Sequence, residues 1–125
     1  MGEYKQFLQL THTLLTYLET LSNRFVKAKE TGEKGDFYEE VKPFADEVKE
    51  INDKWQMEAE KWIKTDKPKN IHMQQIDSTY EHVEILSVQA FFPDTSRSRF
   101  NSSIVSARYV LNNIIYLLTK EEGES

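Results

Sequence analysis

Apolar residues recur at intervals of three and four in four long segments, and only short breaks separate them. The segments span about 3–31, 36–65, 71–92 and 95–120. This spacing places apolar side chains on one face of an α-helix, and helices of this length are about 33–43 Å long. Short links between long amphipathic helices force neighbours to run antiparallel. Residues 1–125 are therefore predicted to form one all-α domain, an antiparallel up-down-up-down four-helix bundle.

Glycine and proline mark the places where the segments end. Gly32 suits the left-handed position that follows the last turn of a helix. Asp36 can cap the second segment, and Glu39 three residues later completes a capping-box pattern. Pro68 and Pro93 then stop the second and third segments, because proline lacks the N–H that a helix needs.

Pro43 lies inside the second segment and complicates its helix. Proline removes a backbone donor and disfavours helical geometry at the preceding residue, Lys42. Either a short first turn ends there and the main helix starts near Pro43, or one helix kinks at this point. The apolar phase runs through Pro43 without slipping, so we predict a nearly continuous helix.

Charge and composition restrict the partners and the compartment. The net charge is −5, whereas non-specific nucleic-acid binding needs a basic footprint. No apolar run approaches the roughly 20 residues of a transmembrane helix, and the first residues lack the pattern of a signal peptide. The chain contains no cysteine, which fits a reducing compartment. We expect a cytoplasmic protein with neither a nucleic-acid nor a membrane partner.

The polar residues form no recognisable catalytic or metal-binding pattern. Di-metal helical bundles use Glu-x-x-His motifs, and none occurs here. The histidines are His12, His72 and His82, and His72 is expected to cap or pack at the start of the third helix. A Gly-x-Ser-x-Gly turn and a glycine-rich phosphate loop are also absent. We therefore predict no catalytic residue, no metal site and no cofactor.

Trp55 and Trp62 are seven residues apart and share one helical face. Tryptophan on an apolar stripe usually fills volume between helices. The alternative is a small-ligand-binding or enzymatic bundle with a pocket near these two rings.

Arg97 and Arg99 begin the fourth segment, at the positive end of the helix dipole, where a cation is unfavourable. Free N–H groups at a helix start bind anions. The two arginines are therefore candidate anion contacts.

A second set of apolar residues lies off the main stripes. It consists of Leu10 and Tyr17 in the first segment, Ile85, Val88 and Phe92 in the third, and Val105, Tyr109 and Tyr116 in the fourth. Helices that are wrapped on two sides within the bundle would explain these residues, and bundle packing favours this interpretation. Alternatively they form an exposed patch for a partner. The candidate partner surface is Val105, Tyr109, Tyr116, Ile85 and Val88.

Several short stretches resemble a known family. They are Glu39-Glu40-Val41-Lys42-Pro43, Trp55, Lys67-Pro68-Lys69-Asn70-Ile71-His72, Arg99-Phe100 and Tyr109-Val110-Leu111. From about Phe37 to the end of the fourth segment the chain resembles the YppE-like proteins of Gram-positive, Bacillus-type bacteria. In the first segment only the apolar pattern is similar. The resemblance implies a helical bundle in a bacterial cytosol and supplies no catalytic motif.

The function is expected to lie in a surface, because the chemistry needed for catalysis is missing from the sequence. We predict a non-enzymatic bundle that acts through an unknown protein partner or through self-association as a homodimer. The small-ligand or enzymatic bundle with a pocket near Trp55 and Trp62 is the alternative.

Overall fold

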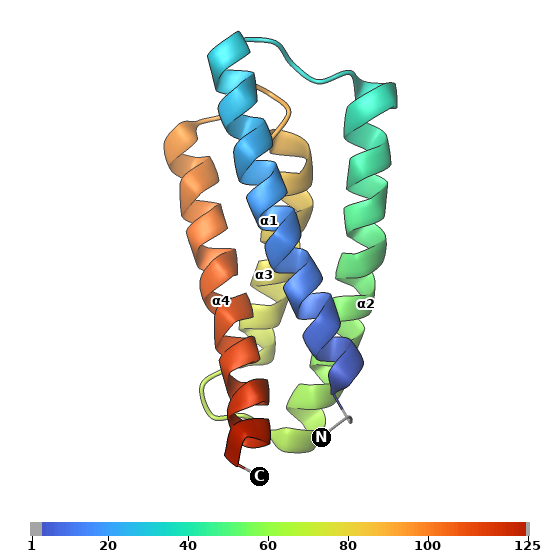
Figure 1. Ribbon diagram of the computed structural model, residues 1–125, viewed down its shortest axis with the longest axis vertical. Coiled ribbons are helices and arrows are strands. Elements are labelled where there is room, and N and C mark those ends of the chain that lie inside the picture. The colour runs from blue at the N-terminus through green and yellow to red at the C-terminus, as the bar shows by residue number, and fades with distance from the viewer. Residues whose placement is uncertain (1–3, 125) are drawn as a thin grey trace.

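The chain forms four long helices that run alternately up and down (Figure 1). The computed structural model describes the backbone of residues 4–124 and the side chains of residues 4–120. Within these residues there is no strand. The helical elements are α1 (Lys5–Thr31), the π-helical turn η1 (Phe37–Val41), α2 (Lys42–Asp66), α3 (Met73–Gln89) and α4 (Arg97–Glu124). The prediction of an all-α four-helix bundle is confirmed.

Each helix packs against the helices that precede and follow it, and α1 closes the ring against α4. The two described ends of the chain consequently lie at the same end of the bundle (Figure 1). The pair α1 and α4 forms one side, and the pair α2 and α3 forms the other. This pairing matters for the surfaces, because charge differs between the two sides.

The helix boundaries follow from local chemistry. Gly32 adopts the left-handed conformation at φ 71°, and its N–H bonds to the carbonyl of Ala28 at 2.8 Å. The side chain of Asp36 accepts a hydrogen bond from the N–H of Glu39 at 2.8 Å. The expected start of the first helix at residue 3 lies outside the described residues. Helix α3 is shorter than the predicted range 71–92, whereas α4 continues beyond its predicted end at residue 120 to Glu124.

Pro43 is accommodated by a π-helical turn rather than by a break. The N–H of Val41 bonds to the carbonyl of Asp36 at 3.0 Å, and the N–H of Lys42 bonds to Phe37, each five residues earlier. Pro43 then sits in the first turn of α2, a position that proline tolerates because its fixed φ suits the start of a helix. The chain is thus helical from Phe37 to Asp66, but the wider first turn was not predicted from the sequence.

The core contains both tryptophans. Trp55 is fully buried and Trp62 is 3% exposed, with the ring of Phe7 centred 6.5 Å and 5.5 Å from them, respectively. The indole Nε1–H of Trp55 donates to Oγ1 of Thr11 at 3.1 Å, and that hydroxyl donates to the carbonyl of Phe7 at 2.8 Å. Core side chains therefore cover both indoles, and neither ring is open to a ligand.

No helix in the described part of the chain is long and apolar enough to span a bilayer.

Candidate functional site

Three of the apolar residues off the main stripes belong to the bundle interior. Leu10 is 8% exposed. Tyr17 is half-buried, lies edge-on to Phe44 with ring centroids 5.6 Å apart, and donates to Glu47 at 2.8 Å. Phe92 is half-buried against the core. For these three residues the interpretation of helices wrapped on two sides is correct.

The other five residues point into solvent, so for them the wrapped interpretation is wrong. Their exposed fractions are 51% for Ile85, 40% for Val88, 61% for Val105, 66% for Tyr109 and 58% for Tyr116. The described chain leaves the outer sides of α3 and α4 uncovered at these positions, since the helices pack toward the interior of the bundle. Their role as a partner surface stays a prediction.

The outer side of α4 differs from ordinary protein surface in its charge. Residues 95–120 contain no aspartate or glutamate, although the chain has 21 such residues in all. Val105, Tyr109 and Tyr116 are four and seven residues apart, so they lie on one face, opposite the buried stripe that includes Leu111. Serine and asparagine supply most of the remaining exposed side chains. We call Val105, Tyr109, Tyr116 and the neighbouring Arg108 the α4 face.

The opposite side of the bundle is acidic. Ten carboxylates lie between Asp36 and Asp66, and α3 carries three more with no lysine or arginine. The five lysines of α2 each lie within 4 Å of a carboxylate of the same helix. By contrast, Arg97, Arg99, Arg108 and Lys120 of α4 have no ion-pair partner among the described side chains. Among the described side chains, the four cations of α4 are thus not paired with a carboxylate.

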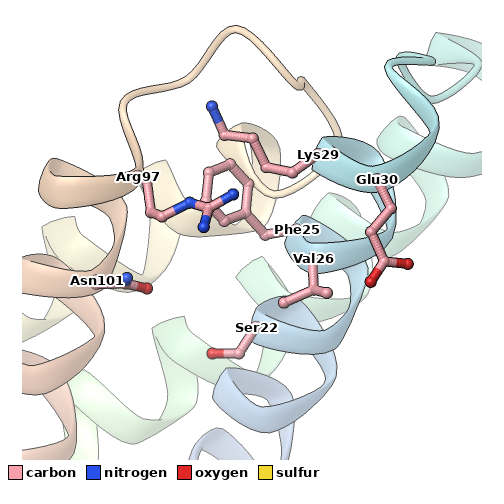
Figure 2. A pocket seen from close by; sticks show the side chains of 7 residues that line it. All are labelled: Ser22, Phe25, Val26, Lys29, Glu30, Arg97 and Asn101. Carbon is pink, nitrogen blue, oxygen red and sulfur yellow. The ribbon is translucent and has the colours of Figure 1, made fainter.

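A cleft of about 400 Å³ opens between the last turns of α1 and the first turns of α4 (Figure 2). Phe25 forms its floor and stacks on Phe100, with ring centroids 4.1 Å apart and planes inclined by 22°. The other lining side chains are Ser22, Val26, Lys29, Glu30, Arg97 and Asn101.

The cleft changes the predicted anion contact. Arg97 lines it, whereas Arg99 is not among the lining residues. Side chains two positions apart on a helix point in different directions, so the two arginines do not line this cleft together. Their role as anion contacts stays a prediction. The second cation of the cleft is Lys29 of α1, whose Nζ lies 5.4 Å from the centroid of the Phe25 ring. The sequence analysis did not identify Lys29 as part of this site, because Lys29 and Arg97 are close in the fold but far apart in the sequence.

A second cleft, of about 370 Å³, lies between α1 and the start of α2. The cation of this cleft, Arg24, is already neutralised, because it donates two hydrogen bonds to the carboxylate of Glu40, at 2.8 and 3.0 Å. The hydrogen bond from Arg24 holds the pKa of Glu40 below its usual value. The guanidinium also lies 5.0 Å from the centroid of the Phe91 ring. This arrangement ties α1 to η1 and the α3–α4 link, and leaves no unpaired cation among the lining residues.

The remaining perturbed groups join helices to one another. Burial, followed by the hydrogen bond to Glu47, raises the pKa of Tyr17 to about 12. The hydrogen bond to Asp53, together with burial, raises the pKa of Tyr80. These contacts stabilise the packing of α2 on α1 and α3, and none of these groups lines the α1–α4 cleft.

The histidines are apart from one another. His72 precedes the first turn of α3, where its N–H donates to Oε1 of Gln75 at 2.8 Å. His12 is exposed on α1, and His82 is half-buried beside α4. In the described part of the chain, no group of three or more histidine, aspartate or glutamate side chains could hold a metal ion.

Residues 11–117 match the model of a bacterial domain family of unknown function, DUF1798. The chain belongs to this family. A DUF1798 relationship thus extends into α1, where the sequence resemblance rested on the apolar pattern. The uncharacterised protein YppE of Bacillus subtilis (strain 168) is 25% identical over 116 residues, which cover 93% of this chain and 94% of YppE.

Solved structures of related proteins have the same fold. A Listeria innocua protein of unknown function superposes with a TM-score of 0.89 at 28% identity, over 95% of this chain and 94% of that one. A DUF1798 protein from Staphylococcus aureus gives 0.83 at 24% identity, over 89% and 94% of the two chains. These proteins are described as having unknown function, so the family establishes the fold and the bacterial lineage, and no specific activity.

Proposed function

We propose that the protein is a non-enzymatic, cytoplasmic binding bundle that recognises an acidic surface of a partner protein through the α4 face. The observation that carries this proposal is the combination, on one helix, of exposed Val105, Tyr109 and Tyr116 with a complete lack of carboxylates over residues 95–120. The cytoplasmic setting is supported by the cysteine-free composition.

The composition of the α4 face matches that of interface cores. Tyrosine and arginine are enriched at protein interfaces, where glutamate, aspartate and lysine are depleted. Tyrosine is also prominent among the residues that dominate binding energy. On α4, Tyr109 and Tyr116 stand among serine and asparagine side chains, with Arg108 beside them. The exposed side of α2, by contrast, carries several carboxylates.

Charge favours a different protein over a second copy of this chain. Pairing two α4 faces around Tyr109 would bring the two copies of Arg108 close together, and like charges across an interface are unfavourable. An acidic partner would instead neutralise them. Ile85 and Val88 are left out of the proposed surface because their helix, α3, is acidic. Its carboxylates are Asp77, Glu81 and Glu84, and they would repel an acidic partner.

The proposal is tested by affinity capture from the bacterial lysate with a double variant, Tyr109→Ser with Tyr116→Ser. The matched control is Tyr38→Ser, since Tyr38 is 78% exposed but lies on η1. The wild-type chain and the control should retain the same protein, and the double variant should lose it. Retention should also fall as salt rises, because charge contributes to the contact. A partner kept by the double variant, or no partner at all, contradicts the proposal.

Self-association is measured separately by light scattering across a concentration series. The proposal expects a monomer at every concentration. If the wild-type chain formed a dimer and the Tyr109→Ser, Tyr116→Ser variant did not, the partner of the α4 face would be a second copy of this chain and not a different protein.

A further inference from the structure

Two cations reach into the α1–α4 cleft from opposite walls. In Figure 2 the side chain of Lys29 extends from α1 and that of Arg97 from α4, both above Phe25. Neither lies within 4 Å of a carboxylate of the described residues. Glu30 lines the same cleft, but its carboxylate points away from both cations (Figure 2). Two like charges thus line one cleft, and neither is paired with a carboxylate of the described residues.

The helix dipole explains the position of Lys29 but not that of Arg97. Lysine in the last turn of α1 is favourable, because the helix dipole is negative there. Arg97, however, is the first residue of α4, where the dipole is positive and a cation is disfavoured. An anion between Lys29 and Arg97 would be favourable to both side chains and to the start of α4.

The floor of the cleft is apolar. Phe25 stacks on Phe100 on one side and contributes to the cleft on the other. Val26, beside it, is 53% exposed. Ser22 and Asn101 add neutral hydrogen-bonding groups. A volume of about 400 Å³ falls within the range of small-molecule sites.

We propose that this cleft binds a small organic anion, a phosphate monoester or carboxylate attached to an aromatic or aliphatic body. Lys29 and Arg97 hold the oxyanion by charge-assisted hydrogen bonds. Phe25 and Val26 contact the apolar body. The cleft and the α4 face have no residue in common.

The test is an amide-NMR titration with three probes: phenyl phosphate, inorganic phosphate and phenol. The first carries both the anion and the ring, and each of the others lacks one of them. Phenyl phosphate should shift the amides of residues 22–30 and 97–101 to saturation. Inorganic phosphate and phenol should each bind at least about tenfold more weakly, since each loses one set of contacts.

Matched variants separate the cleft from general surface charge. Lys29→Met and Arg97→Gln should each weaken phenyl phosphate about tenfold or more, the equivalent of one charge-assisted hydrogen bond. Lys27→Met and Arg99→Gln each remove a charge of the same kind two positions away and should leave the affinity within about twofold. The charge-preserving Arg97→Lys variant should retain most of the binding. Unchanged amide spectra of the free variants would verify that the fold is intact.

Three results would overturn the proposal. The first is the absence of saturable shifts with phenyl phosphate up to about 20 mM, a concentration that corresponds to negligible affinity. The second is an equal loss of affinity in the Lys27 and Arg99 variants. The third is binding of inorganic phosphate as tight as that of phenyl phosphate, because the apolar floor would then contribute nothing.

Discussion

Replacing Thr11 by valine tests the buried contact between α1 and α2 at a single atom. Valine has nearly the shape of threonine but lacks the hydroxyl. In the wild-type chain this hydroxyl accepts the indole N–H of Trp55 at 3.1 Å, and both side chains are fully buried. Thr11→Val therefore keeps the packing of the core and leaves the indole N–H without its partner.

The expected change in the free energy of unfolding follows from the fact that leaving a buried donor unpaired costs more than a satisfied hydrogen bond contributes. A satisfied neutral hydrogen bond contributes only about 0.5–1.5 kcal/mol, whereas a buried donor left unpaired costs about 1–3 kcal/mol. The bond from the hydroxyl to the carbonyl of Phe7 adds little, because that carbonyl is part of the α1 backbone ladder. We expect Thr11→Val to lower the free energy of unfolding by about 1–3 kcal/mol.

Urea unfolding followed by circular dichroism measures this change, and Thr16→Val is the matched control. Thr16 also lies on α1 and donates to the carbonyl four residues earlier, His12, at 3.2 Å, but it is exposed. Its substitution should change the free energy of unfolding by no more than about 0.5 kcal/mol. If both variants behaved alike, or if Thr11→Val were neutral, the buried hydrogen bond would not stabilise the fold as argued.

Two further predictions concern the connection from α1 to α2, which includes Gly32 and η1. Glu40→Gln removes a carboxylate whose pKa is lowered by the hydrogen bond from Arg24. Because the pKa is lower in the folded state, the ion pair stabilises the fold fully above the usual carboxylate pKa of 4.5. This contribution is lost as the pH falls through the lowered pKa. The stability difference between wild type and Glu40→Gln, measured by urea unfolding from pH 7 to 3, should therefore shrink below pH 4.5, and a constant difference would contradict the pairing. Gly32→Ala forces a side chain into the left-handed conformation at φ 71°, which should cost about 1 kcal/mol in thermal or urea unfolding; an unchanged or raised stability would refute the strain.

The helices and their order could be predicted because apolar periodicity is local and strong in every segment. The caps at Gly32 and Asp36 were visible for the same reason, since each depends on residues within one turn. The π-helical turn before Pro43 was not visible, because proline permits a break, a kink or a widened turn, and the choice depends on packing against the rest of the bundle.

The surfaces were only partly predictable. Tyr17 and Tyr109 both lie off the main stripes, yet Tyr17 faces α2 and Tyr109 faces solvent. The arrangement of neighbouring helices decides this, and a single sequence does not specify it. The divergence of Arg97 from Arg99 could have been found from their spacing alone, since positions i and i+2 do not share a face. The proximity of Lys29 to Arg97 could not be predicted in this way, because it depends on the packing of α1 against α4.

The most direct test of the α4 face is photocrosslinking inside the living cell from a photoreactive amino acid placed at position 109. Position 38 serves as the comparison, because Tyr38 is also exposed and lies on η1, away from α4. The proposal predicts a discrete adduct with another protein from position 109 and none of that mass from position 38. An adduct at the mass of two copies, the same adducts from both positions, or no adduct from position 109 would contradict it.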